Sequence, residues 1–109
     1  MRIGAVYVNN VKAGYIQEDV DGYVFFYIKE YLERKDATAV SLTLPLSNNI
    51  YKSEVLFPFF DGLIPEGYLF SAAINYFKID YRDRMGLLLK TCKDVIGNVS
   101  IEEVVDYER

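Results

Sequence analysis

Histidine and tryptophan are both absent from these 109 residues, and cysteine occurs once, as Cys92. Without histidine the chain cannot form a Ser-His-Asp triad, a Cys-His pair or an imidazole metal site. A lone cysteine cannot form an internal disulfide or supply a zinc-binding thiolate cluster, and it lacks a histidine base. The sequence therefore predicts no catalytic residues, no metal and no other cofactor, and we interpret Cys92 as a core residue.

Long apolar runs and an excess of positive charge are also missing. The most apolar segment, residues 55–64, is interrupted by Pro58, Asp61 and Gly62, so it is unsuited to spanning a membrane. Twelve basic and sixteen acidic residues give a net charge of −4, which disfavours direct binding to nucleic acid. The N-terminus lacks the apolar core of a signal peptide. We therefore expect a cytoplasmic protein that binds neither membranes nor nucleic acid directly.

Three sequence patterns resemble ligand or catalytic sites, but each has a feature that argues against such a site. The glycines of residues 62–67 have the spacing of a phosphate-binding loop, but the Lys and Ser or Thr that should follow are absent. Residues 19–22 begin like a calcium loop and lack its bidentate Glu. Helix capping and alternating strand faces explain the carboxylate pairs better than acid-base catalysis does. These pairs are Asp80 with Asp83 and Glu102 with Glu103.

The composition is that of one folded domain spanning residues 1–109. Apolar residues make up 51% and charged residues 26% of the chain, which disfavours disordered and fibrous classes. Seven Phe and ten Tyr bring aromatic residues to 16%, more than a core of this size normally holds. We therefore expect some aromatic rings at the surface, where they would form a contact patch.

The first half of the chain predicts a sheet. Residues 2–8 and 11–16 predict a hairpin turning at Asn9-Asn10, because asparagine tolerates positive φ. Gly14 indicates a bulge or a close packing neighbour within the second strand. Residues 23–28 are apolar on both faces, which favours a central strand buried on both sides.

Two further strands are expected, one in the middle and one at the end of the chain. Residues 40–44 alternate between apolar and polar, which predicts a strand with one wet face that Pro45 ends. Residues 98–105 predict a final strand that returns to the sheet. Residues 29–38 fit either one short helical turn or an irregular excursion.

Helical spacing dominates between these last two strands. Ser53 is a candidate cap for a first helix, which Pro58 either kinks or delays to a later start. Residues 68–77 predict a second helix, and Asp80 is a candidate cap for a third at 81–91. The separation of strands from helices predicts an α+β fold: an antiparallel sheet of about five strands packed with about three helices in a single compact domain.

Two segments, VSLTLPL at 40–46 and FPFFDGLIPEGY at 57–68, closely resemble the N-terminal subdomain of HipA-like kinases. In that family an S-L-S-L-P-L segment leads into a helix ending F-F-x-x-L-L-P-E/D-G/S. The opening hairpin, the aromatic residues 25–27 and the glycine before the last strand are also similar, so the resemblance covers about residues 3–105. The family's ATP-binding and catalytic residues belong to a later kinase core outside these 109 residues. We therefore expect the subdomain standing alone.

This resemblance implies a function. The chain is similar to the small HipS-type antitoxins of split HipA-like kinase systems. It would then be a non-catalytic binding partner of a HipA-like Ser/Thr kinase toxin, acting as an antitoxin or regulatory subunit. The alternative is a structural subunit that a split kinase needs for activity. A helix-turn-helix repressor accompanies such kinases, so any contact with DNA would be made indirectly, through a complex.

The predicted partner-binding residues lie in the second matched segment, where aromatic rings on a proline-stiffened turn suit an interface hot spot. They are Phe57, Phe60, Asp61, Ile64, Pro65, Glu66, Gly67 and Tyr68. Tyr68 is the first candidate, because stand-alone relatives often have Trp at this position, and Trp can enter a partner's pocket. The helical spacing of the phenylalanines is, however, more often that of core residues than of an interface. Asp61, Glu66 and Gly67 also fit a role in building the turn.

Overall fold

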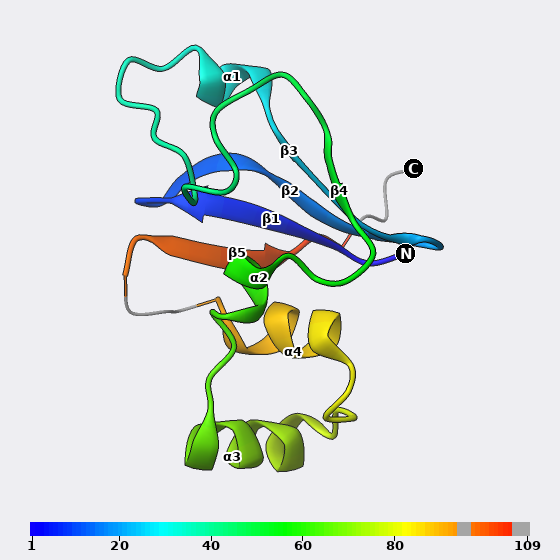
Figure 1. The fold of residues 1–109 in the computed structure, drawn as a ribbon. Coiled ribbons are helices and arrows are strands. Elements are labelled where there is room, and N and C mark those ends of the chain that lie inside the picture. Colours follow the sequence, from blue (N-terminus) through cyan, green and yellow to red (C-terminus); the bar gives the residue numbers. More distant parts are fainter. Residues whose placement is uncertain (94–96, 106–109) are drawn as a thin grey trace.

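One antiparallel sheet forms the centre of the computed structural model, which describes residues 1–93 and 97–105 (Figure 1). Its spatial order is β4-β3-β2-β1-β5, so the last strand returns beside the first. The strands are β1 (Ile3–Val8), β2 (Val11–Asp19), β3 (Gly22–Tyr27), β4 (Tyr51–Ser53) and β5 (Val99–Glu103).

The β1–β2 hairpin forms as the sequence predicts. Asn9 and Asn10 both adopt positive φ, of 51° and 67°, as a two-residue hairpin turn requires. The register shifts between Val6, which pairs with Gly14, and Tyr7, so a bulge lies here. The Phe26 carbonyl also packs so closely on Gly14 that a Cβ would not fit. Both features expected at Gly14 are confirmed.

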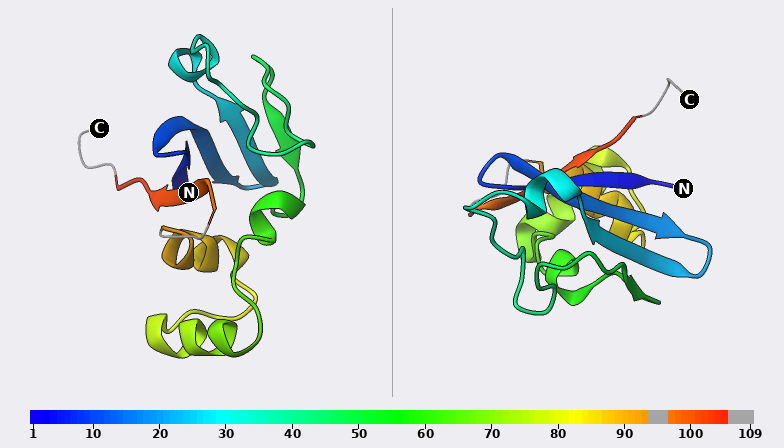
Figure 2. Two further views of the ribbon diagram at one scale, coloured as in Figure 1. Left: turned by 90° about the vertical axis from the view of Figure 1, so that its left-hand side faces the viewer. Right: turned by 90° about the horizontal axis from the view of Figure 1, so that it is seen from above.

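Four helices accompany the sheet within the described residues, and two of them are longer than a single turn. They are α1 (Lys29–Leu32), α2 (Pro58–Asp61), α3 (Gly67–Phe77) and α4 (Arg84–Thr91). Helices α2 and α4 lie against one face of the sheet, and α3 lies beyond α4, away from the sheet (Figures 1 and 2). The predicted α+β class and the single compact domain are confirmed, with one more helix than expected.

The core lies between the sheet and the helices α2 and α4. Its fully buried large side chains are Val6, Ile16, Phe25, Phe60, Met85, Leu87, Leu88, Cys92 and Ile101. Gly4 allows α4 to approach the sheet, because a Cβ there would lie 2.8 Å from Ile101 Cγ2 and 2.9 Å from Leu89 Cδ2. The interpretation of Cys92 as a core residue is confirmed, and burial raises the pKa of its thiol.

The strand predicted at residues 40–44 is wrong. This segment forms a tight turn closed by a single bridge between Ser41 and Leu44, and the fourth strand is β4 instead. The alternating pattern has another cause: Val40 and Leu44 are buried, whereas Leu42 is 99% exposed. The Tyr27 hydroxyl accepts a hydrogen bond from the Val40 amide at 3.0 Å and donates one to the Leu44 carbonyl.

Strand β3 is interior, as predicted, but only one of its faces is buried. It lies between β2 and the three-residue β4. Phe25 and Tyr27 point into the core, whereas Val24 and Phe26 are half-buried on the face opposite α2 and α4. The predicted burial on both sides is therefore wrong, because the fold is a two-layer one at this strand.

In the most apolar segment, residues 55–64, the helix begins only at Pro58. Of the two alternatives at Pro58, the later start is confirmed, since α2 begins with Pro58 at its first position, where a missing amide costs nothing. Ser53 does not cap a helix, because its Oγ accepts from the Val55 amide in a turn, at 3.3 Å. Of the two alternatives for residues 29–38, a short helical turn is present as α1.

Helix α4 begins later than predicted. Asp83 caps it by accepting a hydrogen bond from the Gly86 amide at 3.0 Å, so the predicted cap at Asp80 is wrong. Asp80 instead accepts hydrogen bonds from Arg82 in the preceding turn. The helix predicted at 68–77 and the final strand are confirmed as α3 and β5.

Candidate partner-binding site

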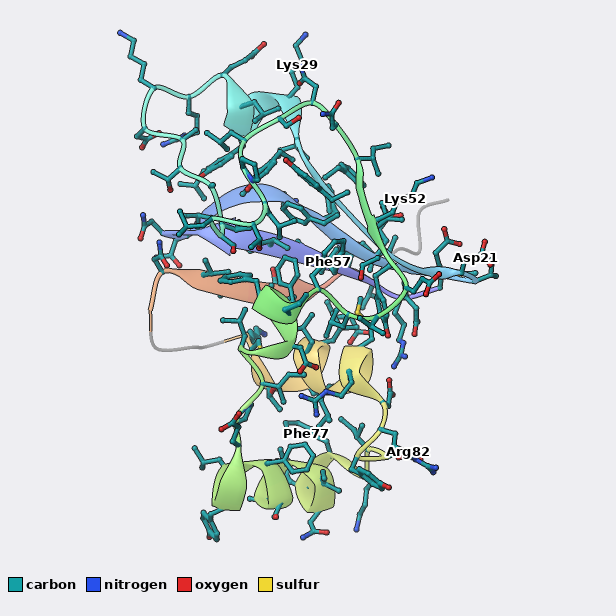
Figure 3. The ribbon with its side chains drawn as sticks, in the orientation of Figure 1. Asp21, Lys29, Lys52, Phe57, Phe77 and Arg82 are labelled. Atoms are coloured by element: carbon teal, nitrogen blue, oxygen red, sulfur yellow. The ribbon has the colours of Figure 1, made fainter. Side chains whose placement is uncertain are left out.

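Two phenylalanines fix the beginning of the predicted site to the sheet. Phe60 is completely buried, and its ring centroid lies 5.4 Å from that of Phe25 on β3. Phe57 is 7% exposed and lies 6.1 Å from Phe60, ring to ring. Figure 3 shows Phe57 above α2, pointing toward the sheet. These rings make α2 a rigid base for the residues that follow.

The chain changes direction between α2 and α3. Ile64 is buried at 3% exposure, and Pro65 after it is half-buried. Glu66 is the N-cap of α3, with extended backbone and no side-chain capping bond. Gly67 has a φ of +63°, a conformation that residues with a Cβ rarely adopt. This turn directs α3 away from the sheet, as Figure 1 shows.

An ion pair ties this corner to α4. Arg84 Nε donates to Asp61 Oδ1 at 2.6 Å, which links α2 to the first residue of α4. The Arg84 guanidinium also lies over the Phe70 ring of α3, 5.8 Å from its centroid. Asp61 therefore has a structural partner within the chain.

The eight predicted site residues fall into three groups by exposure. Three are buried: Phe57, Phe60 and Ile64. Two are half-buried: Asp61 and Pro65. Three are exposed at the beginning of α3: Glu66, Gly67 and Tyr68. Tyr68 stands out because 84% of this large side chain is exposed. A partner approaching the isolated chain would meet the exposed group first.

The structure adds residues that the sequence reasoning did not assign to the site. We call Tyr68, Leu69, Ala72 and Tyr76 the outer face of α3, because all four are exposed. Leu69 is 62% and Tyr76 is 80% exposed. The opposite side of α3, which carries Phe70 and Ile74, packs against the core, and Phe77 lies toward α4 (Figure 3). The signal was available, since residues 67–77 contain no charged side chain.

The corner offers little to a small ligand. A shallow cavity of about 270 Å³ is lined by Pro65, Glu66, Gly67, Phe70 and Arg84. Its one basic group, Arg84, is already paired with Asp61. Residues 1–93 and 97–105 contain no group of three or more potential metal ligands. Within those residues, no helix combines the length and apolar character that crossing a membrane requires.

The five-stranded antiparallel sheet, with α3 projecting beyond α4 (Figure 1), defines a small α+β domain. Comparison with known proteins identifies the family of this domain. Residues 4–102 match the HipA N-terminal domain, so this chain belongs to the HipA N-terminal domain family. An uncharacterised protein of Haemophilus influenzae is 31% identical over 103 residues, which cover 94% of this chain and 93% of that protein.

A solved structure shows the same fold. The N-terminal domain of HipA toxin superimposes with a TM-score of 0.74 at 25% sequence identity, covering 97% of this chain and 95% of that one. The resemblance inferred from residues 40–46 and 57–68 is therefore confirmed: the chain shares the family and the fold of the HipA N-terminal domain.

Proposed function

We propose that this chain is a non-catalytic binding partner of a HipA-like Ser/Thr kinase and acts as its antitoxin or regulatory subunit. Membership of the HipA N-terminal domain family supports the choice of partner. The observation that carries the proposal is Tyr68, a large aromatic side chain that is 84% exposed on a rigidly anchored corner. The relative from Haemophilus influenzae consists almost entirely of this domain, which is consistent with a protein that works without a fused kinase core.

The absence of histidine supports the non-catalytic part of the proposal. Arg2, Arg34, Arg82 and Arg84 are each paired with a carboxylate of this chain, so they are engaged in structure. Burial raises the pKa of the one thiol, at Cys92, which keeps this group protonated and unreactive near neutral pH. We therefore assign the active site to the partner.

Docking would use the exposed group at the beginning of α3. Tyr68 would enter a pocket of the kinase, and Pro65, Glu66 and Gly67 would form the rim around it. Phe57, Phe60, Asp61 and Ile64 would hold this rim in place from within the chain. The buried residues Phe57, Phe60 and Ile64 fix the point where α3 begins, which limits the conformational entropy lost in this part of the corner when the complex forms.

Co-expression with the HipA-like kinase encoded beside this chain tests the proposal. We expect the two proteins to co-purify, and we expect Tyr68→Ala to weaken binding by at least about tenfold, as loss of an aromatic hot spot does. Tyr7→Ala is the matched control, because Tyr7 alternates on β1 with the core residues Val6 and Val8, so its side chain lies on the other face of the sheet. Failure of the wild-type chain to co-purify with the kinase, or equal binding by Tyr68→Ala, would exclude docking through this corner.

The alternative function is a structural subunit that the kinase needs for activity. The replacement of a larger Trp-type contact by Tyr68 favours this alternative, since a smaller ring fills a pocket less completely. Kinase assays with and without the chain separate the two functions: an antitoxin lowers phosphorylation and restores growth, whereas an activating subunit raises phosphorylation. Tyr68→Ala should abolish whichever of these two effects on kinase activity the wild-type chain has.

Association with DNA would be indirect. The net charge of −4 disfavours direct contact with DNA, so we propose that this cytoplasmic protein reaches an operator only through a helix-turn-helix repressor bound to the same kinase. We expect no mobility shift of operator DNA by the chain alone at physiological salt. A shift by the isolated chain would contradict this part of the proposal.

A further inference from the structure

Helix α3 has the composition of a buried helix but the position of a surface helix. Its eleven residues, Gly67–Phe77, include no charged side chain, and none of them is buried among the described residues. Its polar residues Ser71 and Asn75 are exposed on one flank, and the other residues are apolar or aromatic. An apolar helix face is normally covered by protein. Phe70 and Ile74 already pack against the core, so the uncovered part is the outer face defined above. This face needs a partner to bury it.

Three of the four outer-face residues, Tyr68, Ala72 and Tyr76, are arranged symmetrically about Ala72. Tyr68 lies four residues before Ala72 and Tyr76 lies four residues after it, so the three side chains lie along one ridge. A small residue between two large ones lets a second helix approach closely at the centre. When two copies cross in antiparallel orientation at Ala72, Tyr68 of each lies at the level of Tyr76 of the other. Such a surface is self-complementary, as a twofold dimer interface requires.

The charges at the two ends of α3 favour the same orientation. Glu66 precedes the helix, and Lys78 follows it as the C-cap. Antiparallel pairing places Glu66 of one copy at the level of Lys78 of the other and opposes the two helix dipoles. Parallel pairing would bring like charges together at both ends. The ends therefore select the antiparallel arrangement that the tyrosines permit.

We propose that the outer face of α3 binds the same face of a second copy, forming an antiparallel twofold dimer centred on Ala72. One eleven-residue helix from each copy gives an interface well below the roughly 1,600 Å² of a standard stable complex. The dimer is therefore weak, with a dissociation constant on the order of 100 μM. Weak pairing of this kind shields the apolar face at high concentration and yields to a tighter partner.

The dimer and the kinase complex would use the same side chain. Tyr68 belongs to the outer face of α3 and is also the residue to which we assign kinase docking. The two associations therefore compete, so the free chain would exchange its own copy for the kinase. This consequence depends on the function proposed above, whereas self-association of the isolated chain does not.

Sedimentation equilibrium of the purified chain, from about 10 μM to about 1 mM, brackets the expected association. The wild-type chain should shift from monomer toward dimer across this range. Ala72→Glu places two carboxylates at the dyad and should keep the chain monomeric throughout. Val20→Glu is the matched control, because Val20 is 78% exposed at the distant β2–β3 turn, and it should dimerise like the wild type. Circular dichroism verifies that each variant is folded.

Charge reversal tests the antiparallel orientation. Glu66→Lys and Lys78→Glu should each weaken the dimer by about threefold, as rim charges do, and the double variant should regain the wild-type affinity. A double variant weaker than both single variants would overturn the antiparallel arrangement.

Other occupants of the outer face give distinct results. A chain that is monomeric at about 1 mM overturns the dimer, and if that chain still binds the kinase through Tyr68, the proposed function stands. A monomer that sediments instead with anionic lipid vesicles assigns the face to a membrane surface and also overturns the dimer. A dimer that Ala72→Glu leaves intact overturns the assignment to α3.

Discussion

Arg2 illustrates how single residues connect distant parts of this chain. Its guanidinium lies 2.7 Å from Glu18 Oε2 on β2 and 2.8 Å from Asp83 Oδ1, the cap of α4. Hydrogen bonding by Arg2 lowers the pKa of both carboxyl groups. The two carboxyl groups stabilise the folded chain through Arg2 only when they are ionised. Their contribution is present above their unfolded pKa values, near pH 4, and is lost as pH falls through the lowered folded values.

We predict that Arg2→Met lowers the free energy of unfolding at pH 7 by about 1 kcal/mol, a value reduced by the partial exposure of all three side chains. The difference from wild type should shrink as pH falls from about 4.5 to about 2, because protonated carboxyls no longer favour the arginine. Urea unfolding at several pH values measures this. Arg34→Met, which breaks the exposed pair with Asp36, should leave stability almost unchanged.

The Tyr27 side chain anchors residues 40–44, the segment that the alternating pattern wrongly predicts to be a strand. Its hydroxyl bonds the Val40 amide and the Leu44 carbonyl, both in the buried part of the turn. Burial raises the pKa of this phenol, so it stays protonated and able to donate. Leu42 lies at the tip of the turn between these two anchored residues and is 99% exposed.

Replacing that hydroxyl should be costly. We predict that Tyr27→Phe lowers the free energy of unfolding by about 1–3 kcal/mol, since two buried backbone groups lose their partner. Tyr7→Phe is the matched control, because the Tyr7 hydroxyl contacts Glu102 at the surface, and it should change stability by less than about 0.5 kcal/mol. Thermal unfolding compares the two variants. Equal losses would show that the Tyr27 bridge contributes nothing beyond its ring.

At the scale of elements, the sequence predicts most strands and helices. It does not predict where each one begins and ends, or which of its faces pack against other elements. The hairpin at Asn9-Asn10 and the later start at Pro58 follow from backbone chemistry that is local. The 40–44 segment fails because alternation records which side chains are buried, and an anchored turn can bury every other apolar residue as a strand does. Local pattern also cannot show that β3 has cover on one face only.

The candidate site was predicted in part for a similar reason. Exposure of Tyr68 and burial of Phe60 depend on the direction that α3 takes after the turn, and this direction depends on tertiary contacts. Helical spacing alone groups Leu69, Ala72 and Tyr76 on one side without showing whether that side faces the core. In the structure this side faces outward, and Phe70 and Ile74 face inward.

The turn itself can be tested at Gly67, whose φ of +63° occurs with open space around the position of a Cβ. We predict that Gly67→Ala lowers the free energy of unfolding by about 1 kcal/mol through backbone strain alone. Gly67→Asn should cost less, because asparagine tolerates this conformation. Urea unfolding of both variants distinguishes them. If Asn and Ala were equally destabilising, the conformation at residue 67 would not be the cause.

Across the whole molecule, the burial of side chains decreases from the sheet toward α3. Helix α4 buries Met85, Leu87 and Leu88 completely against the sheet, whereas α3 buries no residue. Figure 2 shows α3 as an outer layer that meets the rest of the fold on the side of α4. Regions with few buried contacts open at a lower free energy than the core does. The part of the chain that we assign to partners is therefore the part that the chain itself stabilises least.

Hydrogen exchange measures this gradient directly. In dilute solution, where the chain is monomeric, we predict that backbone amides of α3 exchange at least about 100-fold faster than those of α4, because α3 can open without unfolding the sheet. Addition of the kinase, or concentration of the chain, should slow exchange in α3 and leave α4 unchanged. If α3 were as protected as α4 in the dilute chain, contacts within one copy would already stabilise it. The apolar outer face would then not need a partner to stay folded, and the main physical argument for its docking role would fail.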